Sequence, residues 1–307
     1  MKKKIGIALA VVATAVISIV SLVGCAKPVT DLKLVDTQTD ALLEVQANTA
    51  DIAIVDGVMA GYTLAQEGNS YDKLTMIDVK GFTPEAESYG VAAKLGNTNL
   101  INYINKRLYE LNESGKYMEI LKKYGVEGRK VTFTEPTGEW EDWKSEIVNN
   151  TITIGFTLAP PYGMGSNNKP EGLDFDLAKE VFKDDNITIK GKIINWDDKI
   201  TELNSNYIDL VWNGMTIRDE FKGKIEVSVP YMKNSQVLVV SKKNAEKFKS
   251  IEDLKGYVIV AEKGSAGRNA GMLIFSKVDK ETFKEWLTKN PTDKKIWEAE
   301  NPNWDKN

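Results

Sequence analysis

Short apolar runs rich in valine and isoleucine alternate with segments of helical periodicity along most of this chain. Such alternation is typical of an α/β fold in which mostly parallel strands are connected by helices, so it restricts the fold class strongly. A helix is expected over residues 100–124, where apolar residues recur on one face. The expected strands are residues 51–56, 74–78, 90–94, 151–156, 190–195, 208–212, 236–241 and 257–261.

The N-terminus has the pattern of an export signal. Lys2, Lys3 and Lys4 precede an uncharged run over residues 5–24, which ends in Leu22-Val23-Gly24-Cys25. A charged start, an apolar core and this cleavage sequence predict a lipoprotein signal peptide over residues 1–24, with the lipid carried by Cys25. The alternative is an uncleaved transmembrane helix, because ~20 apolar residues can span a bilayer. Both alternatives place the remainder outside the cytoplasm, anchored to the cell membrane.

Composition excludes several classes of function. The formal net charge is -4, and removal of the three N-terminal lysines leaves a more acidic body, which argues against nucleic acid as a partner. Histidine is absent, and with it the commonest general base and transition-metal ligand. We therefore expect no Ser-His-Asp enzyme, no metal and no cofactor. Cys25 is the only cysteine, so no disulfide is expected.

A series of short motifs follows in the second half of the chain. They are Ile154–Thr157 with Pro160-Pro161-Tyr162, Gly172–Ala178, Trp196-Asp197, Ile208–Leu210, Asn213–Thr216, Pro230-Tyr231, Gln236–Val240, Asp253–Gly256 and Gly264–Gly267. In this order and spacing, residues 151–267 resemble the N-terminal portion of the polar amino-acid solute-binding proteins, solute-binding family 3. The resemblance implies a two-lobed type II periplasmic-binding-protein fold, also called a Venus flytrap.

The first half of the chain resembles the remaining, C-terminal portion of the same family, from Asp40–Leu43 and Asp51–Asp56 to Lys122–Gly125. The order of the two portions is thus swapped, as in a circular permutation, which is plausible because the ends of a domain often lie close together. A gene-fusion accident remains the alternative. Residues 268–307 match no part of the family that can be placed.

The swapped order predicts how the lobes are assembled. The second lobe is expected to be discontinuous, from residues 29–88 and 241–307, and the first lobe to cover residues 89–240. Residues 125–150 show neither the periodicity of a helix nor that of a strand. They are expected to be a linker that the ligand site does not need. We favour a monomer, and a dimer that exchanges its halves is the competitor.

The resemblance implies an extracytoplasmic lipoprotein that binds an amino acid between its lobes and delivers it to an ABC permease in the membrane. Asp56 follows an expected strand, where ligands bind in open α/β sheets, and the resemblance assigns it the α-ammonium group. Ser265, Ala266 and Gly267 open an expected helix whose N–H groups can bind a carboxylate. Helix capping is the structural alternative for each of these positions.

Further site residues are expected on the first lobe. Asn213, Gly214 and Thr216 lie just past a strand, where the resemblance implies contacts to the ammonium and carboxylate groups. Tyr162 and Trp196 correspond to aromatic residues that flank the ligand in relatives, and core packing is the alternative for both.

Two departures from the family pattern affect the ligand. The arginine that holds the α-carboxylate in the family is Phe221 here, and Arg218, three residues earlier, is the candidate replacement; an exposed arginine is the alternative. Thr157 stands where relatives for basic amino acids have an acidic residue. A polar neutral or apolar ligand is therefore favoured over a basic one.

Two rival functions stay open. One is an enzyme resembling the cyclohexadienyl dehydratases, which share this architecture; Asp56, Asp219 and Glu220 would be its candidate acid and base. The other is a rearranged remnant that binds nothing.

Overall fold

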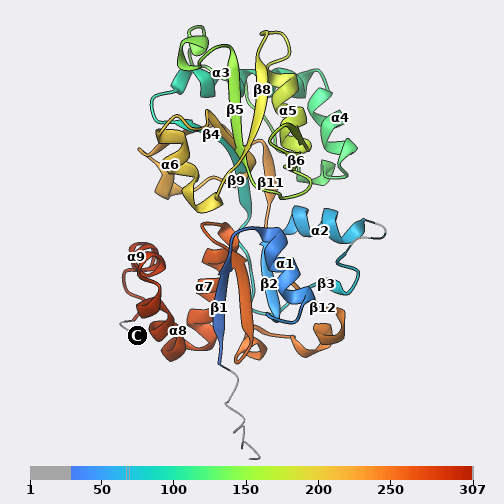
Figure 1. The fold of residues 1–307 in the computed structure, drawn as a ribbon, viewed down its shortest axis with the longest axis vertical. Helices are drawn as coiled ribbons and strands as arrows, with labels where there is room; N and C mark the ends of the chain where they lie inside the picture. Colours follow the sequence, from blue (N-terminus) through green and yellow to red (C-terminus); the bar gives the residue numbers. More distant parts are fainter. Residues whose placement is uncertain (1–28, 67, 69, 306–307) are drawn as a thin grey trace, which may run out of the picture.

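The chain forms two lobes stacked along the long axis of the molecule (Figure 1). The computed structural model describes residues 29–66, 68 and 70–305. Each lobe contains its own sheet, and we call them the lower and the upper lobe after their places in Figure 1. Among the described residues no helix is long and apolar enough to cross a membrane. The run 5–24 and Cys25 lie outside the described residues.

The lower lobe is built on a five-stranded sheet in the order β1-β13-β2-β12-β3. Its strands are β1 (Asp31–Val35), β2 (Ile52–Asp56), β3 (Leu74–Ile77), β12 (Gln236–Ser241) and β13 (Val258–Glu262). β13 lies between β1 and β2 and is parallel to both, whereas β12 is antiparallel to β2 and β3. The sheet therefore combines strands from both ends of the chain.

The upper lobe is built on a six-stranded sheet in the order β10-β4-β9-β5-β8, with β11 also paired to β4. Its strands are β4 (Glu87–Lys94), β5 (Thr151–Phe156), β8 (Thr188–Ile193), β9 (Leu210–Thr216), β10 (Ile225–Val227) and β11 (Met232–Asn234). A separate hairpin joins β6 (Met164–Ser166) to β7 (Lys169–Glu171). β5 is parallel to β8 and β9, and β4 is antiparallel to β9.

Helices cover both sheets. The lower lobe has α1 (Gln38–Gln46), α2 (Gly57–Ala65), α7 (Ala266–Val278), α8 (Lys280–Lys289) and α9 (Pro291–Glu300); the upper lobe has α3 (Thr98–Glu113), α4 (Lys116–Lys123), α5 (Leu173–Val181) and α6 (Lys199–Asn204). Short 3₁₀ turns are η1 (Glu127–Arg129), η2 (Trp143–Glu146), η3 (Trp196–Asp198), η4 (Asp219–Phe221), η5 (Lys242–Lys247) and η6 (Ile251–Leu254). The single helix predicted over residues 100–124 is two helices, because Gly115 has a φ of 77° and interrupts the right-handed path.

The predicted end of the first lobe at residue 240 is wrong, because β12 belongs to the lower sheet. Gln236 pairs with Asp56 and Val240 pairs with Ile52 across β2. The apolar side chains of β12 are buried in the lower core, which gives the strand a strong reason to join that sheet. The upper lobe therefore ends with β11, whose last residue is Asn234.

The chain crosses between the lobes at two places, before β4 and after β11. Glu87, at the start of β4, accepts hydrogen bonds from Asn234 Nδ2 at 3.0 Å and from Gln236 Nε2 at 2.9 Å. This carboxylate ties the two crossing segments to each other, so they form one hinge rather than two independent connections.

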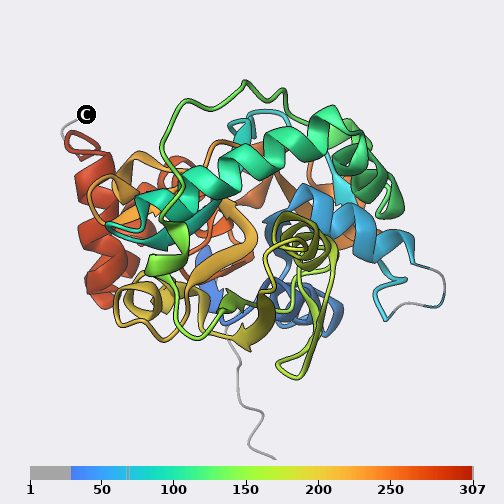
Figure 2. The ribbon, with the colours of Figure 1, turned by 90° about the horizontal axis from the view of Figure 1, so that it is seen from above.

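Residues 125–150 are not the loose linker that the sequence suggested. Trp143 is buried and stacks on Tyr103 of α3, with the ring centroids 4.4 Å apart. The Glu146 carboxylate accepts the backbone N–H groups of Asn99 and Leu100, which caps the first turn of α3. Figure 2 shows the segment, in green, running beside α3. It is part of the upper lobe's packing, since aromatic stacking and a charged cap hold it to α3.

β13, α7 and β1 are arranged in space as in a βαβ unit, but the chain does not connect α7 to β1. α7 follows β13 and packs on β1, yet α7 continues into α8 and not into β1. Asp279, just past the end of α7, accepts a hydrogen bond from Thr30 Oγ1 at 3.2 Å, and Thr30 directly precedes β1. The end of α7 and the start of β1 therefore lie next to each other.

The last helices close the lower core with aromatic side chains. Phe283 of α8 is fully buried, and the rings of Trp297 and Trp304 lie 5.0 and 5.5 Å from it. Trp286 Nε1 donates to the backbone oxygen of Leu32 in β1 at 2.9 Å. In Figures 1 and 2, α8 and α9 lie on the side of the molecule opposite α2. This packing makes the C-terminal segment an integral part of the lower lobe.

Candidate functional site

A cavity lies between the lobes, at the ends of β2, β13 and β9. Most of the predicted site residues line it: Asp56, Trp196, Asn213, Gly214, Thr216, Arg218, Ser265 and Ala266. Residues that the sequence analysis did not assign to the site also line it: Gln38, Tyr89, Thr157, Ala159, Lys199, Met215, Phe221, Gln236, Glu262 and Gly264. Both lobes thus supply the walls, as a ligand site between two domains requires.

Asp56 caps a helix, the structural alternative given for it, and it also lies at the cavity. It ends β2 and caps α2, since its Oδ1 atom accepts the N–H groups of Val58 and Met59, each at 2.9 Å. Its carboxylate also lines the cavity and is almost fully buried. Burial raises the pKa of Asp56 to about 7, although the hydrogen bonds from Met59 and Tyr162 act in the opposite direction. A cation in the cavity would favour the charged form of this carboxylate.

Tyr162 does not line the cavity and instead holds Asp56 from the opposite lobe. Its hydroxyl donates to Asp56 Oδ1 at 2.8 Å, and its ring packs edge-on against Tyr89 at 5.5 Å. Burial raises the pKa of Tyr162 well above its usual value, so the hydroxyl stays a donor. The expectation of an aromatic wall at Tyr162 is therefore wrong, because the ring is packed inside the core behind the carboxylate.

Asn213, Gly214 and Thr216 lie within β9 and not past its end, which corrects their predicted placement. Gly214 has a φ of 62°, and a Cβ atom there would lie 3.1 Å from the Tyr162 ring. Both features favour glycine at this position. Asn213 Oδ1 accepts from the Thr157 backbone N–H at 2.8 Å, while its buried Nδ2 group has no hydrogen-bond partner among the described residues. Asn213 therefore holds the backbone of Thr157 beside β9, and its Nδ2 atom lies next to Gly163, where a Cβ atom would be 2.6 Å away.

Asp174 of α5 holds this part of β9 in place through hydrogen bonds. Its Oδ2 atom accepts from the Gly214 N–H at 2.9 Å and from the Tyr231 hydroxyl at 2.8 Å. The carboxyl is completely buried, and burial raises its pKa to about 7. Asp174 was recognised only as part of the Gly172–Ala178 motif, and nothing in that motif shows that its side chain reaches Gly214.

Trp196 forms a wall of the cavity and is almost fully buried. Arg218 also lines the cavity, but its Nη1 atom is paired with Glu220 Oε1 at 3.0 Å. Phe221, at the position of the family's arginine, is buried and lines the cavity as well. Arg218 is therefore a guanidinium within the site, already held in place by one carboxylate.

The start of α7 contributes through its backbone. Ser265 caps the helix, because its Oγ atom accepts the Arg268 N–H at 3.1 Å and donates to the Glu262 backbone oxygen at 2.8 Å. Gly267 does not line the cavity: a Cβ atom there would lie 2.6 Å from the backbone oxygen of Ile54, so its role is close packing of α7 on β2. The prediction of Gly267 as a ligand contact is wrong for this reason, whereas Ser265 and Ala266 do line the cavity.

Two buried charged groups were missed by the sequence analysis. Glu262, the last residue of β13, is 1% exposed, and its Oε1 atom has no hydrogen-bond partner among the described residues. Burial raises the pKa of Glu262 to about 8, against the effect of Lys199. Lys199 is 6% exposed, and burial lowers its pKa to about 8. Lys199 lies three residues after Trp196, and this helical spacing could have placed both on one face.

The lobes are closed on each other around the cavity. Besides the Tyr162 to Asp56 bond, Lys199 Nζ donates to the Gly264 oxygen at 3.2 Å and Thr39 Oγ1 donates to the Leu158 oxygen at 2.9 Å. Each bond joins one lobe to the other. Among the described residues, no group of three or more histidine, cysteine, aspartate or glutamate side chains could hold a metal ion.

The second half of the chain is similar to one family of known proteins. Residues 152–298 match the family described as bacterial extracellular solute-binding proteins, family 3. The match includes residues 268–298, which the sequence analysis could not place. The L-cystine-binding protein TcyJ of Escherichia coli (strain K12) is 29% identical over 142 residues, which are 46% of this chain and 47% of that protein.

Two other proteins show similar partial coverage. A probable histidine-binding protein of Neisseria gonorrhoeae is 36% identical over 98 residues, 32% of this chain and 36% of that protein. A solved ABC uptake transporter substrate binding protein from Streptococcus pneumoniae with bound histidine is 38% identical, with a TM-score of 0.25, over 27% of this chain and 35% of that one. The chain spans about half the length of the first curated relatives it matches, or less.

Proposed function

We propose that this chain, a relative of the family 3 solute-binding proteins with the two-lobed type II periplasmic-binding-protein fold, binds a free amino acid between its lobes and delivers it to an ABC permease. The observation that carries the proposal is the position of Asp56. Its carboxylate is fixed by two backbone N–H groups and Tyr162 and borders a cavity with donors on the opposite wall. A zwitterion needs both an anion and donors, held where water is excluded.

In this proposal the α-ammonium group of the ligand pairs with Asp56. The α-carboxylate is placed against Arg218 and the first N–H groups of α7, next to Ser265 and Ala266. A guanidinium is a good partner for a carboxylate, and a helix N-terminus adds donors and a favourable dipole. Arg218 thereby takes the place of the arginine that Phe221 has replaced. A basic ligand is disfavoured, because Thr157 supplies no negative charge and Lys199 lies in the same wall.

An enzyme on this fold has less support. The curated relatives reported above are named as binding proteins. Asp219, one of the predicted catalytic acids, has a side chain that is 92% exposed and paired with Lys222, so it does not reach the cavity. Glu220 is paired with Arg218.

A thermal-shift screen of the purified protein against the twenty common amino acids tests the proposal. A ligand at one hundred times its Kd should stabilise the folded state by ~2.7 kcal/mol, which raises the Tm by several degrees. We expect one amino acid or one chemical group of them to give this shift. Absence of any shift would favour a remnant without binding activity, and turnover of arogenate or prephenate in the same samples would favour the enzyme.

We also propose that the protein is anchored by lipid on Cys25. The support is the Leu22–Cys25 sequence after the apolar run of residues 5–24. We expect Cys25→Ala to release the protein from the membrane fraction, because the lipid would be the only anchor after cleavage. Fractionation followed by N-terminal sequencing measures this. A Cys25→Ala protein that stays in the membrane with an intact N-terminus would show that residues 5–24 are a transmembrane helix.

The swapped order of the two portions is proposed to be a circular permutation. The support is the contact of Thr30 with Asp279, because the end of α7 and the start of β1 lie where a continuous βαβ unit would join them. We propose that the protein acts as a monomer in this arrangement, since β13 completes the lower sheet of its own chain.

A further inference from the structure

Lys199 is a buried cation whose hydrogen bonds go to neutral groups. Its Nζ atom donates to the Trp196 oxygen at 2.9 Å and to the Gly264 oxygen at 3.2 Å, and it lies 4.9 Å from the centre of the Trp196 ring. Within the described part of the chain, no ion pair includes Lys199. An ammonium group has three donors, so the third remains for a group in the cavity that Lys199 lines.

The charged neighbours of Lys199 leave this ammonium without a dedicated counter-charge. Arg218 and Arg268 are cations that act on it, and both already have carboxylate partners, Glu220 and Asp293. Asp197 and Glu262 are the acidic groups that act on it, but neither is within 4.0 Å as an ion pair. A buried ammonium is costly without an anion close by, which indicates that the anion comes from outside the protein.

We propose that Lys199 is the specificity-determining residue of the cleft and binds a carboxylate on the ligand's side chain, so that the ligand is an acidic amino acid. This inference rests on the proposed function, which assigns the ligand's α-ammonium to Asp56 and its α-carboxylate to Arg218. The side chain of the ligand then extends along Trp196 to the Lys199 ammonium, both of which line the cavity.

The partner left for Lys199 favours an acidic ligand over the alternatives. In the proposed pose Asp56 pairs with the ligand's ammonium, Arg218, which also contacts Glu220, pairs with its α-carboxylate, and Lys199 pairs with its second carboxylate. A neutral amino acid leaves the Lys199 ammonium without an anion, and a basic one adds a second cation beside it. Burial raises the pKa of Glu262 to about 8, so that near pH 7 its carboxyl is mainly protonated and does not supply the missing charge.

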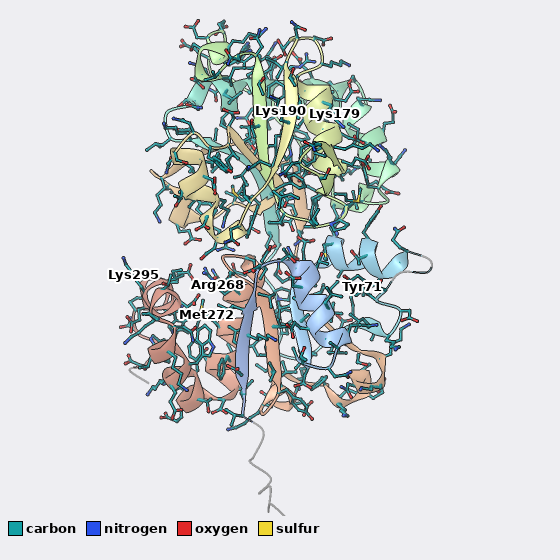
Figure 3. The ribbon with its side chains drawn as sticks, in the orientation of Figure 1. Tyr71, Lys179, Lys190, Arg268, Met272 and Lys295 are labelled. Carbon is teal, nitrogen blue, oxygen red and sulfur yellow. The ribbon has the colours of Figure 1, made fainter. Side chains whose placement is uncertain are left out.

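Calorimetric titration of the purified protein with glutamate, glutamine, aspartate and asparagine tests this, because each acid differs from its amide mainly in charge. We expect the wild type to bind one of the acids about 10- to 100-fold more tightly than its amide. Lys199→Met, similar in length but uncharged, should remove most of this ratio, because it weakens binding of the acid far more than binding of the amide. Lys190→Met is the matched control, since Lys190 is exposed on β8 and lies in the upper lobe far from the lobe junction (Figure 3).

The outcomes separate the two proposals. If no amino acid binds, the proposed function itself fails; if neutral or basic amino acids bind and the acids do not, only the role of Lys199 is overturned. An equal loss for acid and amide in Lys199→Met would also overturn it, because Lys199 would then serve both ligands alike, through the α-carboxylate or through its bond to Gly264. Should the variant not fold, the acid-to-amide ratio of the wild type decides by itself.

The pH dependence of ligand binding gives an independent test of the role of Lys199. Burial lowers the pKa of Lys199 to about 8, with Arg218 and Arg268 acting in the same direction and Glu262 and Asp197 against it. The acid-to-amide ratio should therefore fall as the pH rises from 7 to 9, since Lys199 loses its proton and Glu262 gains a negative charge over the same range. A ratio that stays constant over this range would contradict the assignment.

Discussion

Replacing Asp56 with alanine is expected to remove amino-acid binding. The ligand's ammonium would then be buried without an anion, and loss of one partner of such a pair typically costs ~2–5 kcal/mol. This corresponds to an affinity about 30- to 5,000-fold lower. Calorimetric titration with the ligand found in the thermal-shift screen measures the change.

The same substitution also removes the cap of α2, so a matched variant is needed. Asparagine caps a helix about as well as aspartate, and its Oδ1 atom can accept from Val58 and Met59 as Asp56 does. We therefore expect Asp56→Asn to keep most of the stability and still lose binding. Ser250→Ala, which removes a cap elsewhere in the lower lobe, should cost about 1 kcal/mol of stability without changing affinity. An unchanged ligand affinity of Asp56→Asn would rule out Asp56 as the partner of the ligand's ammonium group.

Separating the chain at residue 150 is expected to abolish binding in both fragments. Residues 25–150 carry β1 and β2 but lack β13, the strand that lies between them. Residues 151–307 carry β13 and β12 but lack β2, which pairs with both. Neither fragment can complete the lower sheet, and only the first contains Asp56. Each fragment alone should show no titratable binding and no cooperative thermal transition.

Coexpression of the two fragments is the informative control. Because the missing strands fit between their partners, the fragments should assemble and regain binding when produced together. Light scattering of the intact protein should give the mass of a monomer. Full affinity of residues 151–307 alone would contradict the placement of Asp56, and a dimeric mass for the intact protein would favour exchange of halves between two chains.

The sequence was a good guide to the strands with apolar or alternating patterns. The predicted strand over residues 236–241 is β12 with the same bounds, and the one over residues 151–156 is β5. β1 was missed although Asp31-Leu32-Lys33-Leu34 alternates polar and apolar residues, as a half-buried strand does. The strand has only five residues and lies at the edge of the sheet, so the alternation is too short to stand out.

Positions at the cavity could be predicted for residues within a recognisable motif, and were missed where a side chain's position depends on the other lobe. Asp56 and Trp196 line the cavity as expected. Lys199 could not be distinguished from an exposed lysine of a helix, because its burial comes from contact with Gly264 of the opposite lobe. Tyr162 was placed in the wall, since nothing local shows that its hydroxyl reaches Asp56. Contacts with the other lobe determine where the side chains of Lys199 and Tyr162 lie.

If the protein is anchored by lipid on Cys25, as proposed, the order of strands determines which lobe lies nearest the bilayer. β1 runs from Asp31 to Val35, and its carboxyl end points towards the cavity, so its amino end lies at the far base of the lower lobe (Figure 1). With lipid on Cys25, the segment from Cys25 to Asp31 can span at most about 20 Å when fully extended. The lower lobe would therefore lie at the membrane surface. Rotation about the hinge at Glu87 would then move only the upper lobe relative to the proposed permease.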